Sequence, residues 1–224
     1  EALYIITTVI MATTLPLISK AYRDGMTVFK ATLRVIFKLM LMISTAIAGV
    51  VCFHSSELIS LIFGAEFADS SAVMSIYIWV VTFVFGISAI QAAIISAGRQ
   101  RWLMVIFAVH LVFIFGLNLY FIPRYGISGA AAGFLTSFVL VFVLLLFIPK
   151  VGYIGRIWFL SAILPVSASL LLGWSSTLLN LGLWSSVIFV PIGLGGVLFF
   201  SGWFTRAEYE LSKSLLRSKG GDAG

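Results

Sequence analysis

The sequence predicts an all-α membrane protein, a polytopic transmembrane helix bundle with about seven spans. Three observations support this class. Apolar residues make up 61% of the 224 residues and charged residues only 10%, whereas a soluble domain carries about 25% charged residues. The mean hydropathy is +1.15, so too little polar surface is available to cover a globule in water. Uncharged runs of about 20 residues, the length that crosses a bilayer as a helix, recur along the chain.

Short polar connections divide the chain into predicted spans. In chain order these are 2–19, 35–53, 72–98, 102–122, 127–148, 157–174 and 184–204. The last two come from one uncharged run, 157–205, which is too long for a single helix, so we expect a hairpin at its most polar part, 175–184. We assign 1–148 to five spans of one helical lobe, 149–205 to two additional transmembrane helices and 206–224 to a polar tail. Thr205 and Glu208 match a capping box, which predicts a short surface helix at the start of the tail.

A basic segment follows the first predicted span, which closes at Pro16. Lys30, Arg34 and Lys38 recur every four residues, and apolar residues recur beside them with the same period. This spacing predicts a helix with a basic stripe next to an apolar one. Such a helix would lie at the headgroup surface or lead into the next span. An ordinary basic loop is the alternative.

Basic residues occur almost entirely in alternate connections. Of the 14 Lys and Arg residues, all except Arg124 follow or adjoin the ends of predicted spans one, three and five or lie in the tail. This is a positive-inside signal. It predicts that these connections and the C-terminus are cytoplasmic and that residue 1 lies outside. The net charge of +6 is therefore a topology signal, and we expect no nucleic-acid partner.

The opposite side carries an acidic connection and a tight corner. Glu57, Glu66 and Asp69 surround a turn at Gly64, and we interpret these carboxylates as solvated loop charges. The corner is 123–126, between the fourth and fifth predicted spans. Pro123 cannot continue a hydrogen-bonded helix and Gly126 relaxes the backbone, so the chain is expected to turn there.

Gly129 and Gly133 follow this corner as a GxxxG pair inside an alanine-rich run. They predict a smooth stripe on the fifth span, where a neighbouring backbone can approach closely.

Few polar side chains lie inside the predicted spans, and each is informative because polar groups are costly in lipid. His110, near the middle of span four, is a candidate substrate-facing or proton-responsive group lining a cavity; a hydrogen bond to a neighbouring helix is the alternative. Gln91 and Asn118 could contact a polar substrate or serve interhelical hydrogen bonding. Arg99 could meet an anionic phosphate, as could Arg101, although both are also expected as topological anchors.

Several classes of site are absent from the sequence. Cys52 is the single cysteine and there are only two histidines, so neither a disulfide framework nor a multi-ligand metal site is expected. No nucleophile motif, Walker loop or paired carboxylates suggest an enzyme or a cofactor. The polar inventory is also sparse for an ion channel. It better fits a carrier with a cavity between two bundles.

The chain begins with Glu1 and enters apolar sequence at once, without the basic segment of a signal peptide. We therefore expect it to be part of a longer protein that has a further N-terminal part. If that protein starts in the cytoplasm, an odd number of spans precedes residue 1.

Four segments carry a resemblance to a known family: LPLIS at 15–19, LIFGAEF at 61–67, SAGR at 96–99 and NLYFIPRYGISGAA at 118–131. In this order the sequence resembles the C-terminal half of Wzx-like polysaccharide-export flippases, relatives of the MATE exporters and lipid II flippases. The motif positions are mostly structural corners: Pro16, Gly64, Gly98, Pro123, Gly126, Gly129 and Gly133.

The resemblance implies two six-helix lobes around a central cavity, with two added helices in some members. The chain would be the C-terminal lobe, and an N-terminal lobe would complete the cavity. It also implies transport of undecaprenyl-diphosphate-linked oligosaccharide across the bacterial inner membrane, with other polysaccharide-assembly proteins as potential partners. Basic cavity residues are expected to meet the diphosphate, yet the spans here contain almost none.

Three alternatives remain open. A multidrug cation antiporter of the same superfamily would be favoured by an acidic residue inside a span, and none is present. A membrane glycan enzyme such as a polymerase would be expected to have a large outward loop, and the outward connections are short. A non-transporting scaffold would also fit the small-residue stripe at 129–133.

Overall fold

The computed structural model describes residues 2–149, 151–205 and 208, with side chains from residue 12 onward. This part of the chain is helical and contains no strand, which confirms the all-α class. Its elements are α1 (Ala2–Arg23), α2 (Met26–Phe53), α3 (Ser55–Ile62), the 3-10 helix η1 (Ala65–Phe67), α4 (Ser70–Tyr77), α5 (Val80–Ser96), α6 (Arg101–Leu145), α7 (Gly152–Leu178) and α8 (Leu183–Phe200).

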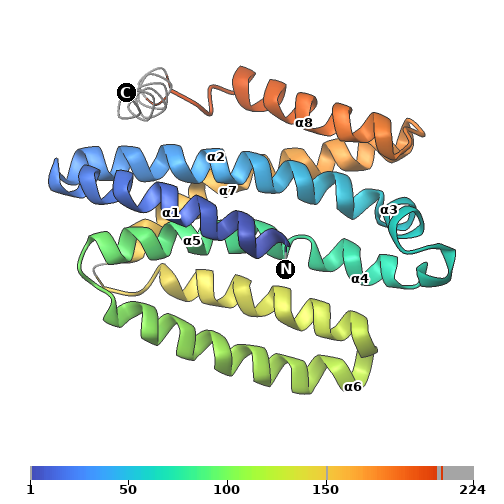
Figure 1. Ribbon diagram of the computed structural model, residues 1–224, viewed down its shortest axis with the longest axis horizontal. Helices are drawn as coiled ribbons and strands as arrows, with labels where there is room; N and C mark the ends of the chain where they lie inside the picture. Colours follow the sequence, from blue (N-terminus) through green and yellow to red (C-terminus); the bar gives the residue numbers. More distant parts are fainter. Residues whose placement is uncertain (1, 150, 206–207, 209–224) are drawn as a thin grey trace.

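The long helices run back and forth between two ends of a bundle (Figure 1). We call one the basic end; it holds the α1–α2 and α5–α6 connections, the start of α7 and the end of α8. The other, the acidic end, holds α3, η1 and the tip of α6. α2 is central, since it packs against α1, α5, α7 and α8. The alternation of charge predicted from the sequence is thus reproduced, while the side of the membrane that each end faces stays a prediction.

Five described helical segments are long and apolar enough to cross a membrane: α2, the combined segment 70–96, α6, α7 and α8. Two of them, 70–96 and α6, differ from the predicted spans. Residues 70–96 form α4 and α5 with a break at Ile78 and Trp79, where i→i+3 hydrogen bonds to Val81 and Thr82 tighten the turn. The predicted first span lies in α1, but side chains 1–11 are outside the described residues. A membrane protein with several spans is therefore supported.

α6 is a helical hairpin rather than one straight helix. The backbone of Gly126 is non-helical, with φ 58° and ψ −136°, and the second half of α6 runs back along the first (Figure 1). The turn predicted at 123–126 is therefore confirmed, at the last residue of that range. Helix continues through Pro123, and the reversal occurs three residues later, because glycine reaches a positive φ without strain whereas proline is fixed near −65°.

The GxxxG stripe has the predicted role, and its neighbour is the first half of the same hairpin. Gly129 and Gly133 are both buried. A Cβ on Gly133 would lie 2.9 Å from Asn118 Oδ1, and one on Gly129 would collide with the backbone carbonyl of Phe121. Only glycine permits this separation between the two halves, so the stripe sets the spacing of the hairpin.

Left-handed residues end three of the long helices. Gly98, with φ 65°, follows α5; its N–H bonds to the Ile95 carbonyl and the Arg99 N–H to the Ile94 carbonyl. This pair of bonds defines a Schellman cap. Asn180 and Gly202 end α7 and α8 in the same manner. The predicted turn at Gly98 is confirmed, and the turn at Gly64 also has a positive φ, 98°.

Four other boundaries differ from prediction. α1 continues through Pro16 to Arg23, so proline does not close that helix. The basic stripe leads directly into the second span, because 26–53 is one helix, and the loop alternative is wrong. α7 already begins at Gly152, inside the predicted connection. The predicted hairpin at 175–184 reduces to residues 179–182, since helical pairing extends to Leu178.

Candidate substrate cavity

Two of the polar candidates line one cavity inside the bundle. It has a volume of about 290 Å³ and lies between α5 and the two halves of α6. Gln91 enters from α5 and His110 from the first half of α6. The rest of the lining is apolar: Val84, Ile87, Ile106, Phe107, Ile114, Phe134, Phe138 and Val141. A small number of polar groups on an apolar wall is the usual make-up of a ligand site.

His110 is held in a fixed orientation by the second half of α6. Its Nε2 lies 3.1 Å from Ser137 Oγ, and its ring meets that of Phe138 edge to face at 4.3 Å. The Ser137 hydroxyl donates its proton to the Phe134 carbonyl at 2.6 Å. Since that proton is already used, the imidazole must donate through Nε2, which leaves Nδ1 as the acceptor of the neutral ring. His110 therefore lines a cavity and contacts the second half of α6 through Ser137, while a role toward a substrate or proton stays a prediction.

Asn118 and Arg99 do not join this cavity. Asn118 lies eight residues beyond His110, about 12 Å along the helix, where its side chain meets Gly133. Its Oδ1 is buried and accepts no hydrogen bond from the described residues. Arg99 follows the Schellman cap of α5 at the basic end. The structure thus brings His110 and Gln91 together and leaves the other two candidates at separate levels of the bundle.

A wider cavity of about 430 Å³ opens at the acidic end, between α4 and the tip of α6. Its polar lining comes from Asp69, Ser70, Tyr77, Tyr125 and Ser128. Asp69, the residue that precedes α4, therefore borders a cavity. Carboxylate, hydroxyl and phenol groups on an aromatic wall can hydrogen-bond to a polyhydroxylated ligand.

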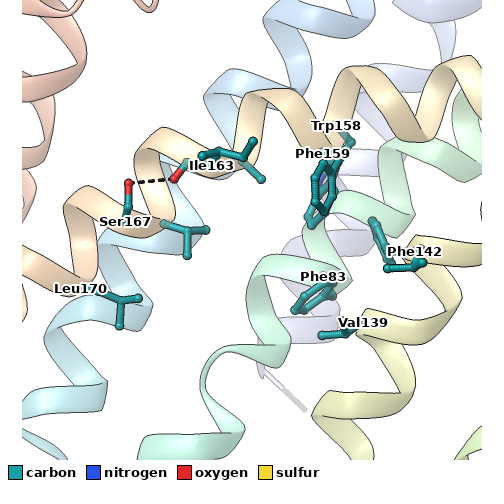
Figure 2. A pocket seen from close by; sticks show the side chains of 11 residues that line it. Phe83, Val139, Phe142, Trp158, Phe159, Ile163, Ser167 and Leu170 are labelled. Carbon is teal, nitrogen blue, oxygen red and sulfur yellow. Dashed lines mark hydrogen bonds between the residues drawn. The ribbon is translucent and has the colours of Figure 1, made fainter. Parts of the chain in front are cut away.

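A third cavity is fully apolar (Figure 2). It has a volume of about 290 Å³, lies between α5, α6 and α7, and includes Phe83, Phe142, Trp158 and Phe159 in its lining. Its one hydroxyl, Ser167, donates within its own helix to the Ile163 carbonyl at 2.9 Å. This cavity offers no group for a polar ligand.

An ionic cluster at the basic end was not predicted as a unit. Lys38 Nζ lies 2.8 Å from Glu208 Oε2 and also donates to the Trp203 carbonyl. The Lys38 ammonium stacks over the Trp203 and Phe204 rings at 5.2 and 5.5 Å. Arg34 is 3.9 Å from the other carboxylate oxygen. Lys38 and Glu208 are both buried, with side chains only 8% and 5% exposed.

The predicted capping box contributes to this cluster. The Thr205 N–H donates to Glu208 Oε2 at 3.0 Å, and the Glu208 N–H donates to Thr205 Oγ1 at 3.3 Å. Burial acts to raise the pKa of Glu208, but the bonds from Lys38 and Thr205 and the Lys38 charge outweigh it, so this pKa lies below its ordinary value. The rest of the expected surface helix lies outside the described residues.

A second unpredicted network joins four elements at the acidic end. Glu57 Oε2 accepts the N–H of Leu183 at 2.7 Å, at the start of α8. Its Oε1 lies 3.2 Å from Nδ1 of the buried His54, whose Nε2 lies 3.1 Å from Ser176 Oγ on α7. The Leu183 N–H, followed by the His54 bond, holds the pKa of Glu57 below its ordinary value. The Glu57 side chain is still 49% exposed, as expected for a solvated charge, but it lies in α3 and takes part in this network.

The described residues contain no group of three or more potential metal ligands. Sequence reasoning placed Lys38 on the basic stripe without its partner, and it missed His54, which belongs to no motif. The one available signal for His54 was its position, since it is a polar residue at the end of an apolar helix. Glu208, the partner of Lys38, and Ser176, a partner of His54, are each more than a hundred residues away in sequence.

Comparison of the chain with known protein families, with curated proteins and with solved structures finds no match.

Proposed function

We propose that this chain is the C-terminal lobe of a Wzx-like flippase, which translocates undecaprenyl-diphosphate-linked oligosaccharide across the bacterial inner membrane for surface polysaccharide synthesis. The observation that carries the proposal is the cavity that His110 and Gln91 line between two membrane-capable segments. A cavity with polar groups among membrane-capable helices is the feature expected of a carrier. The four sequence segments that resemble the flippases supply the family and the substrate class.

In this proposal the diphosphate-linked glycan passes the polar groups of the lobe while its lipid tail stays in the membrane. The outer cavity with Asp69 and Tyr125 supports it, because glycan hydroxyls need acceptors and donors of that kind. The N-terminal lobe of the same protein would provide the basic groups for the diphosphate. Other polysaccharide-assembly proteins are candidate partners.

The cation antiporter is the weaker candidate. Such a carrier needs an anionic group that its cationic substrate can reach from within the membrane. The segments that the structure identifies as membrane-capable contain no Asp or Glu. No observation on the described residues favours an antiporter over a glycan carrier.

The decisive experiment follows lipid-linked glycans in cells that lack the full-length gene. We expect undecaprenyl-linked oligosaccharide to accumulate in the cytoplasmic leaflet while surface polysaccharide disappears. Unchanged surface polysaccharide together with raised sensitivity to toxic organic cations would contradict the flippase proposal and favour the antiporter.

A variant pair tests whether His110 acts in the cavity or only in packing. His110→Ala and Ser137→Ala both remove the bond between the two halves of α6, but only the first removes the imidazole from the cavity. We expect His110→Ala to lower glycan translocation about tenfold or more at unchanged membrane abundance, and Ser137→Ala to have a much smaller effect. Equal losses in both variants would assign His110 a packing role instead.

A further inference from the structure

The cluster around Glu208 has the composition of an anion site. Three donors from two separate parts of the chain converge on one carboxylate: the Lys38 ammonium, the Thr205 N–H and, at longer distance, the Arg34 guanidinium. Both cations belong to the basic stripe of α2, whereas Glu208 follows the last membrane-capable helix. The two cations thus belong to the body of the protein, whereas the anion and the Thr205 N–H come from the segment that follows α8.

Only one of the two carboxylate oxygens of Glu208 accepts hydrogen bonds from the donors of this cluster. Its Oε2 receives both short bonds, at 2.8 and 3.0 Å. Among the described residues its Oε1 is buried without a hydrogen-bond partner and has only the Arg34 ion pair at 3.9 Å. A buried acceptor without a hydrogen bond carries a desolvation penalty. A larger anion with more oxygens could hydrogen-bond to Lys38 and Arg34 at the same time, whereas the carboxylate here is within hydrogen-bond distance of Lys38 alone of the two cations.

The position of the site favours a phosphate group as that anion. Lys38 donates to the carbonyl of Trp203, three residues beyond the end of α8, so its ammonium lies at the level where the last membrane-capable helix ends and where a lysine reaches the headgroup region. The neighbouring Trp203 and Phe204 rings, which stack on the ammonium, are typical of a membrane interface. Basic groups at that level meet the phosphates of anionic lipids.

We propose that Arg34, Lys38 and the Thr205 N–H form a binding site for the phosphate group of an anionic lipid, and that Glu208 is a tethered competitor occupying the same donors. Lipid binding and docking of Glu208 are then mutually exclusive. The tail contact becomes a switch that reports the anionic-lipid content of the surrounding leaflet. This proposal does not depend on the transported substrate.

The test measures binding of phosphatidylglycerol to the purified protein in phosphatidylcholine nanodiscs of increasing phosphatidylglycerol content. Glu208→Gln removes the competitor's charge and keeps its shape. If Glu208 occupies the site for most of the time, the apparent affinity rises by the inverse of the free fraction, about three- to tenfold. Asp24→Asn is the matched control, because it makes the same charge change at the same end, about 21 Å along α2 from Lys38.

A second variant tests the cation. Lys38→Gln alone leaves a buried carboxylate without its partner, which is strongly destabilising. The double variant Lys38→Gln/Glu208→Gln removes both charges and is the suitable comparison. We expect it to lose the affinity for phosphatidylglycerol that Glu208→Gln gains. Lys30→Gln, made in the same Glu208→Gln background, is the control, because it removes another lysine of the same stripe. The proposal is overturned if Glu208→Gln binds no more tightly than Asp24→Asn, or if the double variant retains the gain.

Inorganic phosphate distinguishes the two sources of the anion. Competition by millimolar phosphate in Glu208→Gln would show that the phosphate group alone is recognised, whether free or on a lipid. Phosphatidylglycerol binding without such competition would assign the site to the lipid headgroup. If neither probe binds in a way that depends on Lys38 and Glu208, the site is not an anion site and the proposal fails.

Discussion

Glu57, Glu66 and Asp69 are three carboxylates of one connection with different roles. Glu66 is exposed in η1, as a solvated charge should be, whereas Asp69 borders the outer cavity. Glu57 bonds to His54 and to the first residue of α8. Sequence alone could not distinguish these three roles, because Leu183 of α8 lies 126 residues from Glu57 and meets it only after the helices have assembled.

Glu57 is therefore expected to stabilise the bundle at neutral pH. Because its folded-state pKa is lowered, the stabilisation is present above the unfolded pKa of about 4.3 and is lost as the pH falls through the folded value. Glu57→Gln should lower the thermal unfolding temperature at pH 7, by the loss of a hydrogen bond worth about 1 kcal/mol. This difference should vanish in strongly acidic buffer.

Glu66→Gln is the control for that measurement, since it removes the same charge from an exposed position of the same connection. Thermal unfolding of both variants in one detergent, at neutral and acidic pH, gives the comparison. An equal shift in the two variants at pH 7 would mean that the Leu183 bond contributes nothing measurable.

At the level of elements, the hairpin of α6 was predictable and the crossing of α2 with α7 was not. The hairpin is encoded locally, by a glycine that takes a positive φ and a GxxxG pair that follows it. The α2–α7 crossing depends on small residues far apart in sequence. Ser169 donates to the Thr45 carbonyl at 2.5 Å, and a Cβ on Gly173 would lie 3.0 Å from the Gly49 carbonyl. Periodicity shows which helices are apolar, but not which of them meet.

The hairpin can be tested with two glycines of the same helix. Gly129→Ala inserts a methyl group into the Phe121 backbone, which cannot move without displacing the first half of α6. A Cβ on Gly116 meets nothing within 4 Å. Since alanine is the better helix former by about 1 kcal/mol, Gly116→Ala should be neutral or slightly stabilising. Gly129→Ala should destabilise by about 1–3 kcal/mol, the cost of overpacking.

Thermal unfolding of the two variants in the same detergent checks this expectation. Comparable stability of Gly129→Ala and Gly116→Ala would show that the halves of α6 can separate freely. The GxxxG pair would then not set their spacing.

At the scale of the whole molecule, the charge pattern from end to end was predictable from the sequence, whereas the cavity could be located only in the assembled fold. The charge pattern was predictable because each connection is short and its end of the bundle is fixed by the number of preceding spans. The cavity residues were predicted only in part. His110 and Gln91 stood out as polar residues in apolar helices, but nothing in the sequence indicated that Asn118 would instead face Gly133. That difference arises because Asn118 lies about 12 Å along the helix from His110, at the level of Gly133.

The orientation of the bundle in the membrane is the last prediction. Acidic and basic connections lie at opposite ends (Figure 1), so the positive-inside rule assigns the basic end to the cytoplasm. A reporter enzyme that is active only outside the cytoplasm, inserted after Asp69, should be active, and the same insertion after Arg101 should be silent. Activity after Arg101 and silence after Asp69 would invert the bundle. Inversion would place Lys38 and Glu208 against the outer leaflet and remove the cytoplasmic role of their contact, while leaving the helix packing unaffected.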